Sequence, residues 1–106
     1  MKNIESTPGC IQSAVDILGS KWTALIIRDI ASDPKRFCEL ERSIPRLNPR
    51  TLSKRLQDLE TKDIIQHDQA SGCYFLTEKG SDLLPILKKM AEWGEKHPRP
   101  AHWNVA

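Results

Sequence analysis

The stretch "NPRTLSKRLQDLE" at residues 48–60 decides the fold of this chain, because it combines a helix start with one apolar stripe. Asn48 is a favoured N-cap residue, and Pro49 suits the first helical position, where its missing N–H is not needed. Three leucines recur at the spacing of a single helix face: Leu52, Leu56 and Leu59. The sequence therefore predicts a helix over residues 49–62 with these leucines turned inward.

The other face of this predicted helix carries basic, amide and hydroxyl groups: Arg50, Ser53, Lys54, Gln57 and Thr61. The major groove of B-DNA admits one α-helix and displays hydrogen-bonding base edges. Arg50 and Lys54 suit guanine or phosphate, and Gln57 suits adenine. The short side chains of Thr51 and Ser53 suit phosphate or thymine. The helix alone favours the interpretation as an ordinary surface helix, and the neighbouring segments reverse that preference.

Positive charge is concentrated around this helix. Residues 35–62 hold eight basic and four acidic side chains, a net +4, and the rest of the chain sums to −2. A basic stretch beside a helix with a polar face favours a nucleic-acid partner over an uncharged one.

The flanking segments predict a winged helix-turn-helix, mostly α with a small β-hairpin. Apolar periodicity and turn residues indicate helices over 11–18, 20–33 (capped by Ser20) and 37–44, a hairpin over 64–76, and a last helix over 77–96 that Pro85 bends. One domain over 10–97 is expected, with a flexible arm at 1–9 and an irregular tail at 98–106.

Composition excludes several classes of protein. The 106 residues suit one domain, and the longest apolar runs are too short to cross a bilayer, so a cytoplasmic protein without a membrane partner is expected. The odd count of three cysteines argues against a disulfide scaffold. The histidines and cysteines lack metal-ligand spacing, and no glycine-rich phosphate loop or nucleophile motif is present. We therefore expect no enzyme, no metal and no cofactor.

The predicted last helix is apolar over more than one narrow stripe, which indicates burial against a second chain through the first and last helices. The alternative is that both faces pack on the same small domain. The expected dimer interface comprises Ile11, Val15, Leu18, Leu83, Leu87, Met90 and Trp93. A two-fold dimer would present two recognition helices about 34 Å apart, matching a pseudo-palindromic operator.

Five pieces of the chain, in order, resemble one family: "LGSKW" at 18–22, "PKRFCELERSIP" at 34–45, "LSKRLQDLE" at 52–60, "YFLTEKG" at 74–80 and "LLPILKKMAEWGEKH" at 83–97. Together they are similar to the HxlR-type transcription regulators, winged-helix proteins allied to the MarR group. The resemblance implies a homodimeric DNA-binding regulator that contacts DNA through the helix at 49–62. The candidate DNA-binding residues are Arg36, Arg46, Asn48, Pro49, Arg50, Thr51, Ser53, Lys54 and Gln57.

The chain departs from the family pattern at two places. Cys10 stands where relatives carry a proline that follows a cysteine. The hairpin is short, and no Lys or Arg occurs from Asp63 to Glu78, where relatives carry a wing arginine. Arg46, in the turn before the recognition helix, is a candidate to replace part of that lost charge.

These observations predict a sequence-specific transcriptional regulator, and we expect it to repress rather than activate transcription. It would bind double-stranded DNA as a homodimer, and any small-molecule or electrophile effector is unknown. The alternative function is a winged-helix module that binds another protein with the same face. Cys10 lies at a helix start, where the helix dipole can lower a thiol pKa, so it is a possible redox sensor. The competing interpretation is an inert small residue.

Overall fold

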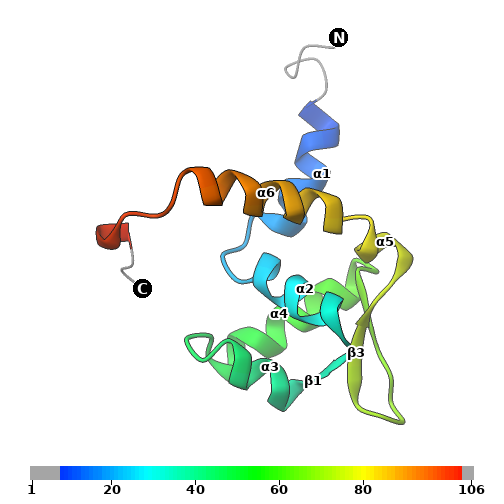
Figure 1. The fold of residues 1–106 in the computed structure, drawn as a ribbon. Helices are drawn as coiled ribbons and strands as arrows, with labels where there is room; N and C mark the ends of the chain where they lie inside the picture. Colours follow the sequence, from blue (N-terminus) through cyan, green and yellow to red (C-terminus); the bar gives the residue numbers. More distant parts are fainter. Residues whose placement is uncertain (1–7, 104–106) are drawn as a thin grey trace.

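The computed structural model describes residues 8–103 of the chain. The elements are α1 (Pro8–Leu18), α2 (Thr23–Ser32), β1 (Lys35–Arg36), α3 (Phe37–Ser43), α4 (Pro49–Thr61), β2 (Ile65–His67), β3 (Cys73–Leu76), α5 (Glu78–Ser81), α6 (Leu84–Lys96) and the 3₁₀ turn η2 (Ala101–Trp103). They form two parts (Figure 1): a body of α2, α3, α4 and the small sheet, and above it a layer in which α6 lies across the end of α1. The predicted winged helix-turn-helix is confirmed.

The core of the body forms where α2, α3, α4 and β2 meet. The three leucines of α4 are 0%, 1% and 2% exposed, which confirms that this stripe is turned inward. The other members of the cluster come from α2, from α3 and the turn after it, from the start of the hairpin and from the residue before α6: Ile26, Ile27, Ile30, Leu40, Ile44, Leu47, Ile64, Ile65 and Leu83. Apolar burial on this scale is the main stabilising contribution, at about 25 cal/mol per Å².

The sheet has the strand order β1-β3-β2, and both pairings are antiparallel. The predicted hairpin is present, with Ile65 opposite Leu76 and His67 opposite Tyr74. The third strand, β1, places Lys35 opposite Tyr74 and was not predicted. A strand of two residues contains no alternation to detect, and its pairing with β3 depends on residues far away in the sequence.

Two predicted helix boundaries are wrong. Ser20 does not cap α2; the N-cap position is Trp22, whose side chain makes no capping hydrogen bond. The segment 77–96 is not one bent helix but two helices. Thr77 caps the short α5, accepting a hydrogen bond from the Gly80 amide at 3.0 Å, and α6 then starts with Pro85 in its first turn. A proline in that position leaves no hydrogen bond unmade, because the first helical amides have no partner within the helix.

Both predicted terminal segments differ from the structure where it describes them. Most of the predicted arm, residues 1–7, lies outside the described residues, and Pro8 begins α1. Within the predicted irregular tail, Ala101–Trp103 form the 3₁₀ turn, and residues 104–106 lie outside the described part. Within residues 8–103, no helix combines the length and the apolar character that crossing a membrane requires.

Gly80 marks a close approach between α5 and the residue that precedes β2. A Cβ atom at this position would overlap the Ile64 carbonyl oxygen and would lie 3.1 Å from Leu76 Cδ2. We expect Gly80→Ala to lower the free energy of unfolding by about 1–3 kcal/mol, because buried backbone must move to admit the methyl group. Urea unfolding followed by circular dichroism measures this.

Gly94, within α6, provides the matched control. A Cβ atom there would have no atom within 4 Å. Gly94→Ala should therefore stabilise the protein by about 0.5–1 kcal/mol, the helix-propensity difference between the two residues. Equal effects of the two substitutions would contradict the close packing of α5 on Ile64.

Candidate nucleic-acid interface

Helix α4, the candidate recognition helix, begins where the sequence indicates. Asn48 has extended backbone angles, and its Oδ1 accepts a hydrogen bond from the Thr51 amide at 2.9 Å. Pro49 occupies the first turn. The helix start is thus fixed by the chain itself. Pro49 has no N–H and the Thr51 amide is bonded to Asn48, so among the described residues the Arg50 amide is the first-turn donor left for an anion such as a phosphate.

The outer face of α4 is exposed and unpaired. Arg50, Ser53, Lys54 and Gln57 are exposed, and none of these side chains hydrogen-bonds or ion-pairs with another described residue. Thr51 is half-buried beside the cap. A helix that reads bases in a DNA groove needs an anchored inner face and free polar side chains on its outer face. Helix α4 has both, because its three leucines are buried and the fold itself does not use its outer polar side chains.

Two further predicted residues flank the helix-turn-helix. The Arg36 amide donates to Glu39 Oε1 at 2.8 Å and so holds the start of α3, while its guanidinium group is unpaired among residues 8–103. Arg46 is exposed in the turn between α3 and α4, next to the buried Leu47. Both guanidinium groups remain available for phosphate contacts.

The wing carries negative charge at its turn. The Asp68 carboxylate accepts hydrogen bonds from the Ser71 hydroxyl at 2.6 Å and the Ser71 amide at 3.1 Å. These bonds hold the pKa of Asp68 below its usual value. His67 stacks on Tyr74 with ring centroids 4.1 Å apart, and burial raises the pKa of the Tyr74 phenol. An acidic turn disfavours contact with phosphate.

Two basic residues, one in α4 and one directly after it, have surroundings that the sequence pattern did not reveal. Arg55 is half-buried, and its Nε atom is buried without a partner among the described residues. Lys62, just after α4, donates from Nζ to the Asp16 carbonyl of α1 at 3.2 Å and to Asp58 Oδ2 at 3.1 Å. Lys62 therefore ties the end of the recognition helix to α1. Helical spacing predicts which residues share a face, but not which neighbouring element that face meets.

An apolar surface spans α1 and α6. Val15, Met90 and Trp93 are 49%, 48% and 63% exposed, and Ile11 and Ile86 are also exposed. Leu18 and Leu87 are half-buried and pack against the core, whereas Leu83 is 8% exposed and belongs to the core itself. Leu83 therefore has almost no surface left for a partner, and Ile86, absent from the predicted interface, is exposed instead.

Cys10 lies in this surface. A groove of about 490 Å³ runs between α1 and α6, lined by Cys10, Ile11, Ala14, Val15, Leu18, Gly19, Ile86 and Met90. Cys10 and Cys38 are exposed free thiols and Cys73 is half-buried. Within the described part of the chain, no three His, Cys, Asp or Glu side chains are grouped to hold a metal ion.

Known proteins share this architecture. The family model of the HxlR-like helix-turn-helix matches residues 17–102. The uncharacterised HTH-type transcriptional regulator YvaP of Bacillus subtilis is 36% identical over 95 residues, covering 85% of this chain and 88% of its own.

Two solved structures extend the comparison. Quinone-bound YodB of B. subtilis superposes with a TM-score of 0.75 at 35% identity, covering 81% of this chain and 94% of its own. The redox regulator HypR in its oxidised form superposes with a TM-score of 0.77 at 32% identity, covering 85% and 98%. The chain belongs to the HxlR-like helix-turn-helix family, and it is a helix-turn-helix transcriptional regulator rather than an enzyme.

Proposed function

We propose that the protein represses transcription by binding a pseudo-palindromic operator as a homodimer, with α4 in the major groove. The observation that carries this proposal is the outer face of α4. Its basic and amide side chains are exposed and unpaired, and the helix beneath them is fixed by buried leucines. Arg50, Lys54 and Gln57 contact base edges in this arrangement, and Arg36, Arg46, Thr51 and Ser53 contact the backbone.

The apolar surface of α1 and α6 supports the homodimer. It lies on the side of the molecule away from α3 and the wing (Figure 1), so a second copy bound there leaves both recognition helices accessible. Contiguous exposed apolar patches are typical of interaction sites, protein–protein contacts among them. In this proposal the wing makes no phosphate contact, because its turn is acidic.

Selection of binding sites tests the function. Genomic fragments retained by the purified protein should share an inverted repeat with half-sites about one helical turn apart. Sedimentation of the complex should give two chains per site, and added protein should lower transcription from a promoter that contains the site. Retention of fragments without any common sequence would contradict specific recognition.

Arg46 gives a prediction on salt dependence. If its exposed guanidinium contacts a phosphate, Arg46→Ala should lower the slope of log affinity against log salt by about one unit, because one fewer counterion is released. Fluorescence anisotropy titrations between low and physiological salt measure the slope. An unchanged slope would place Arg46 outside the interface.

The position of Cys10 supports a second element of function, sensitivity to electrophiles. The thiol is exposed in the groove between α1 and α6, and related proteins have been solved in quinone-bound and oxidised forms. In the proposed step the thiolate sulfur bonds to a quinone ring carbon, and the displaced electron pair moves to a ring oxygen, which takes up a proton. The attacked carbon then loses its hydrogen as a proton and the second ring oxygen gains one, which leaves a hydroquinone thioether. Lys62 links α1 to the end of α4, so a change in α1 can reach the recognition helix.

We expect p-benzoquinone to lower operator affinity of the wild type by about 5- to 150-fold, the usual range for coupling between two sites. Cys10→Ser should abolish this effect without changing the affinity of untreated protein. Cys38→Ser is the matched control, since Cys38 is also exposed but lies in α3. Full quinone sensitivity in the Cys10 variant would exclude this residue as the sensor.

A further inference from the structure

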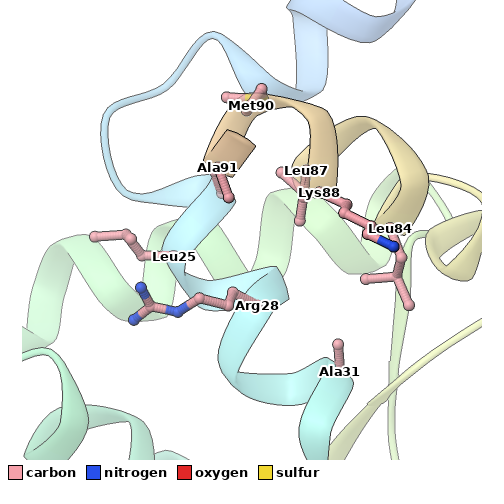
Figure 2. Close-up of a pocket in the computed structure, with 9 residues that line it drawn as sticks. Leu25, Arg28, Ala31, Leu84, Leu87, Lys88, Met90 and Ala91 are labelled. Carbon is pink, nitrogen blue, oxygen red and sulfur yellow. The ribbon is translucent and has the colours of Figure 1, made fainter. Parts of the chain in front are cut away.

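The layer of α1 and α6 leaves a groove where it meets the DNA-binding body. This groove, of about 450 Å³, lies between α2 and α6 (Figure 2), and small side chains of both helices line it in part: Ala24, Ala31 and Ala91. In α1, Ile17 and Leu18 pack against the core. Apolar contacts hold α1 on the body but have little directional preference. A directional contact is therefore needed to fix the angle at which the layer meets the body.

Lys62 supplies such a contact. It is the C-cap residue of α4, and its Nζ donates to the Asp16 carbonyl of α1 at 3.2 Å. Asp16 lies in the last turn of α1, where carbonyl oxygens lack a partner within the helix, and that turn contains no basic residue of its own. The ammonium group therefore caps α1 from another element. The helix dipole also favours a cation at this position.

Lys62 is itself held at both ends. The Asp58 carboxylate, one turn earlier in α4, accepts from the same Nζ at 3.1 Å. The Lys62 carbonyl accepts from Lys79 Nζ of α5 at 2.9 Å. Because a hydrogen bond weakens steeply when it bends, the contact with Asp16 favours one orientation of α1 relative to the end of α4.

We propose that Lys62 is a positioning residue that sets the spacing of the half-sites the dimer accepts. In the proposed homodimer the two chains meet through α1 and α6, and Lys62 ties each α4 to its own α1. The distance and angle between the two recognition helices therefore depend on this contact in both chains. The inference rests on the proposed binding of an operator by a homodimer, and Lys62 touches no DNA in it.

A series of operators that differ only in the spacer tests this role. The full chain is titrated by fluorescence anisotropy against the selected operator, against versions with one base pair added or removed between the half-sites, and against a single half-site. One base pair turns the second half-site by about 35° around the DNA axis. A rigid dimer then loses much of the advantage of its second contact, so the wild-type affinity should fall about tenfold or more. For Lys62→Met the same change should cost about threefold or less, because a looser connection tolerates more than one spacing.

Lys21→Met is the matched control for this variant. Lys21 is exposed between α1 and α2, and its ammonium group lies 4.9 Å from the centroid of the Trp22 ring. The substitution removes the same charge near the same end of α1 but keeps the hydrogen bond from Lys62. Lys21→Met should therefore retain the wild-type dependence on spacer length. The two variants should bind the single half-site equally well and should both sediment as the wild type does.

Two results would overturn the proposal. If Lys62→Met depends on spacer length as strongly as Lys21→Met, Lys62 does not position the helices, although the operator and the dimer stand. If the wild type binds the operator with no preference for spacer length, both this role and the homodimer on which it rests are wrong.

Discussion

Replacing Arg50 and Lys54 by alanine together should reduce operator affinity by about 100-fold at physiological salt. Each side chain that contacts a base contributes about 1–3 kcal/mol, and 1.4 kcal/mol corresponds to a factor of ten. Both side chains are exposed and make no contact that the fold uses, so their loss removes interactions with DNA alone. Gel-shift titration against the selected operator and against a scrambled duplex measures both affinity and specificity.

The control for this variant carries the same change in charge elsewhere. Lys89→Ala with Lys96→Ala removes two positive charges from α6, far along the chain from the recognition helix. It should weaken binding to both duplexes slightly and equally. The urea midpoint of the Arg50/Lys54 variant should match the wild type within about 0.5 kcal/mol, as for other surface substitutions. Unchanged operator affinity at unchanged stability would remove α4 from the interface.

The recognition helix was predictable because its determinants are local. The Asn48 cap, the proline beside it and the leucine period all lie within the helix or one residue before it, and the structure confirms each. The start of α6 has a similar local signal, because Pro85 lies in its first turn. The continuous apolar pattern across 77–96 nevertheless predicted one bent helix. The break between α5 and α6 depends on tertiary contacts: Gly80 must approach Ile64, and Leu83 must enter the core. Neither requirement is visible in a helical period.

In the candidate site, too, the features that depend on local sequence were predictable and those that depend on distant contacts were not. Which side chains share the outer face of α4 follows from the helical period, and that face is exposed as predicted. The pairing of β1 with β3, the contact of Lys62 with α1 and the groove between α2 and α6 all join segments distant in sequence. The acidic wing turn was predictable only in part. The absence of basic residues was visible in the sequence, but the two hydrogen bonds from Ser71 that lower the pKa of Asp68 were not.

Val15→Asp should raise the dissociation constant of the proposed dimer by about 100-fold or more. Val15 is half exposed in the single chain, so an aspartate is tolerated there and folding should persist. In the dimer the carboxylate would be buried against apolar side chains, which costs several kcal/mol when no partner pairs with it. Analytical ultracentrifugation over micromolar concentrations measures the shift. Ala70→Asp, with the same added charge on the exposed wing turn, should sediment as the wild type does.

The loss of the dimer should carry over to DNA. A dimer binds its second half-site as an intramolecular event, which raises overall affinity by about 10²- to 10⁴-fold over one recognition helix alone. Val15→Asp should therefore bind the full operator little better than a single half-site, although Arg50 and Lys54 are intact. Wild-type binding of the full operator by a monomeric Val15→Asp protein would show that one α4 suffices. Wild-type protein that sediments as a monomer would locate the partner of the α1 and α6 surface outside this chain.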